Sequence, residues 1–205
     1  KSRGMHVEHV DVMTLVSKAF QLAYRDIYID LVERLPQLWA HLYHKLDQTE
    51  DDAVLTKMRR AFERVNTSAL REVVAQARAD AIVCTHFLPA ELLARGALRG
   101  HAVPPTWVVV TDFDVHRLWL PPSLVESGVV RGFFVASDEV AFRVREALPS
   151  MPTHVTGIPV MPAFATAPPR ADAARELGIR ADRLTALVMT GGASLSSGAA
   201  MVERL

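Results

Sequence analysis

Residues 107–119 read WVVVTDFDVHRLW, a short apolar run that ends abruptly in polar side chains. An uninterrupted apolar run of this length is typical of a strand buried on both faces, and the polar residues mark where it ends. The same texture recurs in four other runs: Ala81–Cys84, Phe133–Ala136, His154–Thr156 and Leu184–Met189. The sequence therefore predicts a sheet of five strands, with Trp107–Val110 among them and His154–Thr156 as the weakest.

Segments with helical patterning separate these runs: Ala90–Arg99, Glu139–Leu148 and Ala171–Leu177. Ser137 is placed to cap the second helix, and Gly178 closes the third. Strands that alternate with helices predict an α/β fold, in which a parallel sheet carries helices on both faces.

The first 80 residues have a different pattern. Met5–Asp11 alternates weakly, as a strand does, and Met13–Leu35 has apolar residues at helical spacing. A shorter amphipathic piece, Leu38–Leu46, precedes a polar stretch that can cap a long helix running to about Ala79.

Composition narrows the function classes. The 23 basic and 23 acidic residues cancel, so no overall positive field attracts nucleic acid. The single cysteine, Cys84, lies in an apolar run and is interpreted as a core residue in a reducing compartment. No apolar stretch approaches the ~20 residues that a membrane span needs, and no secretory signal opens the chain.

The length of 205 residues predicts one full domain and part of a second. Four prolines between residues 159 and 169 indicate a stiff linker. The predicted division is therefore a domain over 1–158, a linker over 159–170 and the beginning of a second domain over 171–205. The chain starts at Lys1 rather than methionine and stops inside a predicted helix, so we interpret both ends as truncated.

Polar residues and glycines follow every predicted strand: Thr85-His86, Thr111-Asp112, Ser137-Asp138, Gly157 and Thr190-Gly191-Gly192. Open parallel sheets bind ligands beyond the carboxyl ends of their strands. In the last of these turns, Gly191, Gly192 and Ser194 can bring backbone amides close to phosphate oxygens. The turn lacks the lysine of a P-loop and departs from GxGxxG, so an ordinary strand-to-helix turn is the alternative.

Asp112, Asp114 and His116 alternate, and in extended chain they would share one side. Such spacing can serve a divalent metal and resembles the Asp-x-Asp clamp of GT-A glycosyltransferases. We favour carboxylates that order their own loop, since a hard cation needs more oxygen ligands.

His86 is a candidate base or substrate-binding group, with a purely structural histidine as the alternative. An aromatic series can lie in a membrane interface or pack helices against the sheet: Phe20, Tyr24, Tyr28, Trp39 and Tyr43.

Four motifs occur in the order found in one protein family: THFLPA at 85–90, VVTDFDVHRLW at 109–119, FFVASDEV at 133–140 and VTGIPVMPAF at 155–164. They resemble the monogalactosyldiacylglycerol synthases and processive diacylglycerol glucosyltransferases, which are inverting, MurG-like GT-B enzymes. The segment LPQLWAHLY at 35–43 is similar to that family as well. The resemblance implies a GT-B type fold: a Rossmann-like acceptor-side domain and the start of a Rossmann-like donor-side domain.

The resemblance implies transfer of galactose or glucose from a UDP-sugar to diacylglycerol or a similar lipid. It places His86, Asp112, His116 and Trp119 on the acceptor side of the cleft. It places Gly191, Gly192 and Ser194 at the donor phosphates, although Ala193 and Ser194 stand where the family commonly has glycine. No metal or cofactor is expected, and the implied partners are the UDP-sugar, the lipid acceptor and the cytoplasmic membrane surface.

The sequence does not identify the residue that acts as the catalytic base. The family's glycine-rich loop ending in Gly-His would precede Lys1, which leaves His86 and Asp112 as candidates within the chain. The donor-domain motif that holds uridine would follow Leu205, so we expect the 205-residue chain to be inactive by itself. The alternatives are a nucleotide-sugar epimerase, another GT-B enzyme, or a non-catalytic membrane-binding or nucleotide-binding module.

Overall fold

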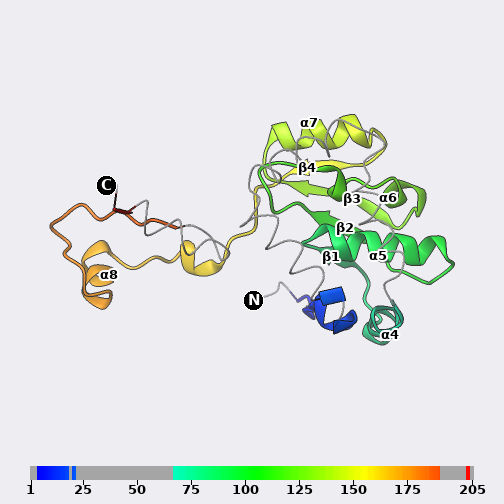
Figure 1. Cartoon of the computed structure of the whole chain (residues 1–205), viewed down its shortest axis with the longest axis horizontal. Coiled ribbons are helices and arrows are strands. Elements are labelled where there is room, and N and C mark those ends of the chain that lie inside the picture. The colour runs from blue at the N-terminus through cyan, green and yellow to red at the C-terminus, as the bar shows by residue number, and fades with distance from the viewer. Residues whose placement is uncertain (1–3, 19, 22–66, 190–201, 204–205) are drawn as a thin grey trace.

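A four-stranded parallel sheet forms the centre of the molecule (Figure 1). The structure, a computed structural model, describes residues 4–18, 20–21, 67–189 and 202–203. The strands are β1 (Ile82–Cys84), β2 (Thr106–Val109), β3 (Val130–Val135) and β4 (Thr153–Val155). They lie in the order β1-β2-β3-β4, and each pairs in parallel with the next. Four of the five predicted strands are therefore confirmed.

Helices connect the strands and flank the sheet. The α-helices are α4 (Ser68–Ala77), α5 (Phe87–Leu98), α6 (Ser123–Glu126), α7 (Asp138–Ala147) and α8 (Arg170–Glu176). The short 3-10 helices are η1 (Val12–Leu15), η3 (Arg117–Trp119) and η4 (Pro162–Phe164). The predicted caps are confirmed: the Ser137 hydroxyl accepts from the Val140 amide at 3.4 Å, and Gly178 follows α8 with a φ of 67°. This is the predicted α/β fold with a Rossmann-like sheet.

The core lies between the sheet and its crossover helices. The chain advances across the sheet in one direction, so right-handed crossovers place α5, α6 and α7 on the same face. Cys84, Val108 and Phe133 are paired across three strands, and all three are buried in the main apolar cluster. Cys84 is only 3% exposed, which confirms the interpretation of this cysteine as a core residue, and burial raises the pKa of its thiol to about 12. On the opposite face, Val109 is 6% exposed while Val83 is 58% exposed, so that face is covered only in part among the described residues.

Two strand predictions are wrong. Met5–Asp11 contains no strand, and its residues are exposed. Leu184–Met189 also forms no strand, and its side chains face solvent, with Leu184 95% exposed. An apolar run becomes a buried strand only where a neighbouring strand takes up its backbone hydrogen bonds, and the described residues offer neither segment such a neighbour.

Several predicted helices lie wholly or partly outside the described residues. Met13–Leu35 begins in η1, where the Asp11 carboxylate accepts from the Met13 amide at 2.9 Å, and its remainder is largely not described. Leu38–Leu46 is not described at all. The long helix predicted to reach Ala79 is represented by α4, which ends at Ala77.

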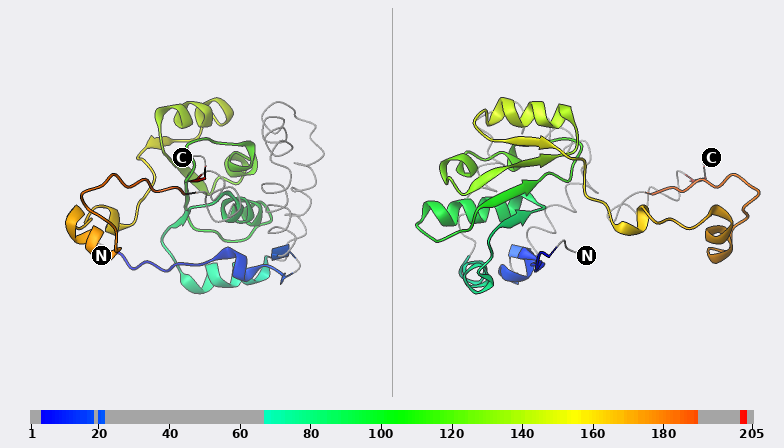
Figure 2. Two further views of the ribbon diagram at one scale, coloured as in Figure 1. Left: turned by 60° about the vertical axis from the view of Figure 1, so that its left-hand side comes forward. Right: turned by 180° about the vertical axis from the view of Figure 1, so that it is seen from behind.

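The chain leaves the sheet after β4. Residues 159–170 are exposed, and α8 lies away from the four strands in both views of Figure 2. Ala174 of α8 is nevertheless buried, and the Arg170 guanidinium donates to the Arg183 carbonyl at 2.7 Å. The division into domains at 158 and 170 stays a prediction.

Gly132 of β3 lies close to the backbone of Pro152, the residue that precedes β4. A Cβ built at this position would lie 2.8 Å from the carbonyl oxygen of Pro152, the same oxygen that accepts the Phe133 amide at 2.8 Å. A contact of this kind with backbone cannot be relieved by turning a side chain. The glycine is therefore required by the register of the two strands.

We expect Gly132→Ala to lower the free energy of unfolding by about 1–3 kcal/mol, because β4 must shift to admit the methyl group. Urea denaturation followed by far-UV circular dichroism measures this. Gly96→Ala is the matched control: its Cβ meets only the His101 side chain, at 3.3 Å, and helix propensity improves. Equal effects of the two substitutions would contradict the close β3–β4 approach.

Candidate functional site

The polar strand ends predicted from the sequence do lie on one edge of the sheet. Because β1 to β4 are parallel, the residues that follow each strand emerge from the same side. Thr85 and Thr111 are directly linked there, since the Thr111 hydroxyl donates to the Thr85 carbonyl at 3.5 Å. This brings the beginning of α5 next to the loop that follows β2.

His86 caps α5. Its backbone is extended, and its Nδ1 accepts a hydrogen bond from the Leu88 amide at 3.2 Å. Amide groups at the start of a helix lack partners within the helix, and this one is satisfied by the imidazole. The sequence prediction began the helix at Ala90, three residues late, because histidine is an uncommon cap.

Two aromatic rings, Phe87 and Trp119, lie against this imidazole, and His116 packs on both of them. The centroid of His86 lies 4.1 Å from that of Phe87 and 6.0 Å from that of Trp119. His116 meets Phe87 edge-on at 5.4 Å, and Phe87 meets Trp119 edge-on at 5.7 Å. Partial burial lowers the pKa of His86, and the nearby Asp112 carboxylate opposes that shift. His86 still has solvent-exposed surface, so a ligand can reach it.

Asp112 and Trp119 close the loop between β2 and α6. The indole Nε1–H of Trp119 donates to Asp112 Oδ2 at 2.9 Å, although Trp119 is only 2% exposed. This bond folds η3 back toward the strand end. We call His86, Phe87, Asp112, His116 and Trp119 the strand-end cluster. It unites all four residues that the sequence placed on the acceptor side.

Asp114 takes a different direction from Asp112. Its Oδ1 accepts from the Arg143 guanidinium of α7 at 2.6 Å and from the Val115 amide at 2.7 Å. The two carboxylates thus order the loop through separate partners, and the extended arrangement with His116 on a common side is not formed. Among the residues that the structure describes, no three His, Cys, Asp or Glu side chains gather as metal ligands would.

A buried carboxylate that the sequence did not reveal lies on α5, the helix that His86 caps. Glu91 of α5 is 5% exposed, pairs with Arg95 one turn further on, and accepts from the Ser123 hydroxyl of α6. It joins the helix that carries His86 to the helix that follows the Asp112–Trp119 loop. Sequence spacing indicates the Glu91–Arg95 pair, but the contact with Ser123 spans 32 positions and needs the fold.

The other predicted strand-end residues cap a helix, shape a turn or lie outside the described residues. Ser137 is occupied as the cap of α7, and Asp138 lies exposed in the first turn of that helix. Gly157 has a φ of 76°, which lets its amide reach the Val135 carbonyl at 3.2 Å. The predicted donor-phosphate residues Gly191, Gly192 and Ser194 lie outside the described residues.

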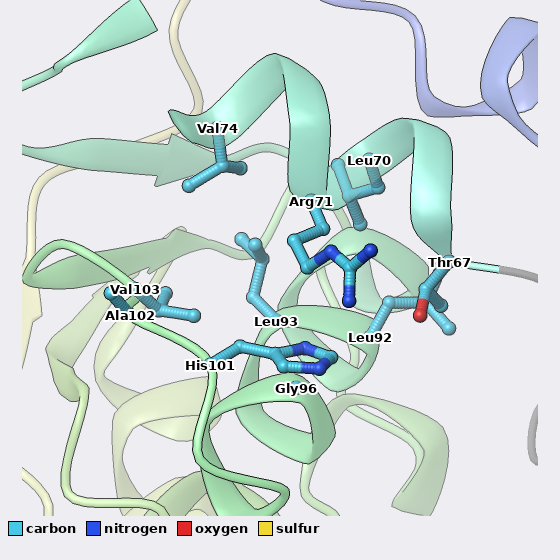
Figure 3. A pocket seen from close by; sticks show the side chains of 10 residues that line it. All are labelled: Thr67, Leu70, Arg71, Val74, Leu92, Leu93, Gly96, His101, Ala102 and Val103. Atoms are coloured by element: carbon cyan, nitrogen blue, oxygen red, sulfur yellow. The ribbon is translucent and has the colours of Figure 1, made fainter. Parts of the chain in front are cut away.

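A pocket between α4 and α5 lies elsewhere on the molecule (Figure 3). Arg71 and His101 line it together with the apolar side chains of Leu92 and Leu93. It shares no residue with the strand-end cluster: Gly96 lies near the end of α5 opposite His86, and His101 follows that helix. It is therefore separate from the strand-end cluster.

Comparison with known families decides the relationship of the chain. The family described as monogalactosyldiacylglycerol (MGDG) synthase matches residues 1–160, more than three quarters of the sequence. The chain belongs to the MGDG synthase family. The match covers the whole four-stranded sheet and the complete strand-end cluster, and the α/β fold is consistent with a GT-B glycosyltransferase domain. The predicted family resemblance is thus confirmed.

Two curated relatives of this MGDG synthase family member are processive diacylglycerol beta-glucosyltransferases. The one from Bacillus pumilus (strain SAFR-032) is 26% identical and the one from Bacillus subtilis (strain 168) is 27% identical, each over 133 residues. Each alignment covers 62% of this chain and 32% of the relative, so the chain spans about a third of their length. No solved structure matches the chain.

The Asp112–Trp119 bond gives a direct test of the loop geometry. We expect Asp112→Ala to lower the free energy of unfolding by about 1–2 kcal/mol, because the indole N–H of a buried tryptophan loses its acceptor. Asp112→Asn keeps an oxygen in place and should cost clearly less. Urea unfolding followed by tryptophan fluorescence measures both, and equal stability of the Ala variant and the parent would contradict the bond.

Proposed function

We propose that this protein is a glycosyltransferase that transfers galactose or glucose from a UDP-sugar to diacylglycerol or a similar lipid. The observation that carries the proposal is the strand-end cluster, which lies at the ligand-binding edge of a parallel sheet within the residues matched by the MGDG synthase family. The names of the curated relatives supply the reaction class and the lipid.

The chemistry of the cluster suits an amphipathic acceptor. His86 and Asp112 are exposed and supply a hydrogen-bonding nitrogen and a carboxylate, over the buried rings of Phe87 and Trp119. Phe113, next to Asp112 in the chain, is 77% exposed and supplies apolar surface. A glycerolipid offers matching groups, an alcohol next to ester-linked acyl chains. We therefore assign this cluster to the acceptor and propose that Gly191, Gly192 and Ser194 bind the donor diphosphate through backbone amides.

We also propose inverting transfer without a metal ion. In the described loop, Asp112 and Asp114 point to different partners, Trp119 and Arg143, rather than to a shared cation position. Charge on the departing diphosphate would then be stabilised by amides at a helix start and by cationic side chains.

The test is a transfer assay on the protein as its gene encodes it, with UDP-glucose and UDP-galactose as donors and diacylglycerol in mixed micelles. We expect glycosylated lipid with one of the donors and equal rates in the presence of EDTA. Activity lost in EDTA and restored by Mg²⁺ or Mn²⁺ would contradict metal independence. An epimerised UDP-sugar without lipid product would indicate the epimerase alternative, and neither product would indicate a binding module.

Reaction with a membrane lipid requires contact with a membrane surface. No helix in the described part of the chain combines the length and apolarity of a membrane span. Phe113, in the loop that also carries Asp112, is 77% exposed beside the strand-end cluster. We propose that the protein lies peripherally on the cytoplasmic membrane and that Phe113 enters the interface.

We expect Phe113→Ser to reduce the fraction of protein that pellets with anionic liposomes at low salt, because an apolar contact with the acyl region is lost. Phe142→Ser is the matched control: Phe142 is 63% exposed but lies on α7, within a helix rather than in the loops of the strand-end edge. Absence of pelleting by the parent protein, or equal loss in both variants, would count against this orientation.

A further inference from the structure

A hydrogen bond and contacts with aromatic rings together fix the orientation of the His86 ring. The Leu88 amide donates to Nδ1 at 3.2 Å, and the ring lies against Phe87 with Trp119 on a neighbouring side. A ring flip would put Cδ2 in the place of Nδ1 and remove the cap from α5. The position of each nitrogen is therefore set by the helix start.

A neutral imidazole carries one proton and one free lone pair. Since Nδ1 accepts the Leu88 amide, the lone pair is on Nδ1 and the proton is on Nε2. A proton can be taken up only at Nδ1, where it would face the amide N–H and break the cap. Acting as a general base would thus cost the protein the hydrogen bond that starts α5.

We infer that His86 serves the strand-end cluster as a fixed hydrogen-bond donor through Nε2–H, and not as the catalytic base. The lowered pKa of His86 agrees with a ring that stays neutral near pH 7. Nε2 makes no hydrogen bond within the described part of the chain, and the residue has exposed surface. The donor is available to a ligand.

Asp112 supplies the complementary acceptor. Its Oδ2 is occupied by the Trp119 indole at 2.9 Å, while Oδ1 has no hydrogen-bond partner among the described residues. An alcohol needs both a donor for its lone pair and an acceptor for its hydrogen, and His86 with Asp112 offers one of each. Resting on the proposed function, we assign the pair to the hydroxyl oxygen of the lipid acceptor.

Two substitutions of His86 test its two functions separately: capping α5 through Nδ1 and donating a hydrogen bond through Nε2–H. Asn at position 86 places its amide oxygen near the position of Nδ1, so it retains the cap but loses the distal donor. Gln places its amide nitrogen near the position of Nε2, so it retains a donor but caps poorly. The pair distinguishes a structural role from a role toward the ligand.

We expect ¹⁵N-resolved NMR of the 205-residue chain at pH 7 to show the His86 proton on Nε2. In urea unfolding, His86→Asn should match the parent, and His86→Gln should unfold at lower urea. In the transfer assay with the gene-encoded protein, His86→Asn should lose about tenfold or more in kcat/KM for the lipid acceptor. His86→Gln should lose clearly less, and the KM for the UDP-sugar should not change in either variant.

A proton on Nδ1 would overturn the inference. So would a parent pH–rate profile with an acidic limb that is absent from both variants, because that limb is the signature of a histidine base. Equal activity loss in the two variants would overturn it too. If the parent transfers no sugar to lipid, the proposed function fails, and the NMR tautomer alone then upholds or overturns the donor assignment.

Discussion

Parallel pairing of the four strands is the constraint from which the rest of this structure follows. Parallel neighbours cannot be joined by a tight turn, so each strand must be followed by a crossover that returns the chain to the starting edge. All four strands consequently end on one side, and the residues that stop each strand are collected there. A set of polar residues scattered over some seventy positions becomes a single surface for this reason.

Collection on one edge does not by itself make a site, because polar strand ends have other uses. Ser137 caps α7, and Asp114 is engaged by Arg143. What distinguishes the strand-end cluster is the buried indole of Trp119, which holds Asp112 and lies against the rings of Phe87 and His86. Glu91 joins α5, the helix that His86 caps, to α6, because its carboxylate accepts from the Ser123 hydroxyl.

The same contacts give the histidine and the carboxylate different roles. The Nδ1 lone pair of His86 accepts the Leu88 amide at the start of α5, and Oδ2 of Asp112 accepts the Trp119 indole N–H. Each group is left with one free function, a donor in the first case and an acceptor in the second. Such pre-set polarity suits the orientation of an alcohol, the group that the proposed glycerolipid acceptor would present.

The sequence by itself determined the parallel α/β fold, the four strands and the caps at Ser137 and Gly178, because apolar runs and their polar ends are local patterns. The family resemblance supplied four members of the strand-end cluster, but neither Phe87 nor the cap that His86 forms. Prediction from the sequence failed at Met5–Asp11 and Leu184–Met189, where a local pattern has no neighbouring strand to complete it. Only the tertiary structure decided that Asp112 and Asp114 diverge, that Glu91 meets Ser123, and which nitrogen of His86 carries the proton. These outcomes depend on contacts between side chains and backbone groups whose relative positions are fixed only when the helices pack on the sheet.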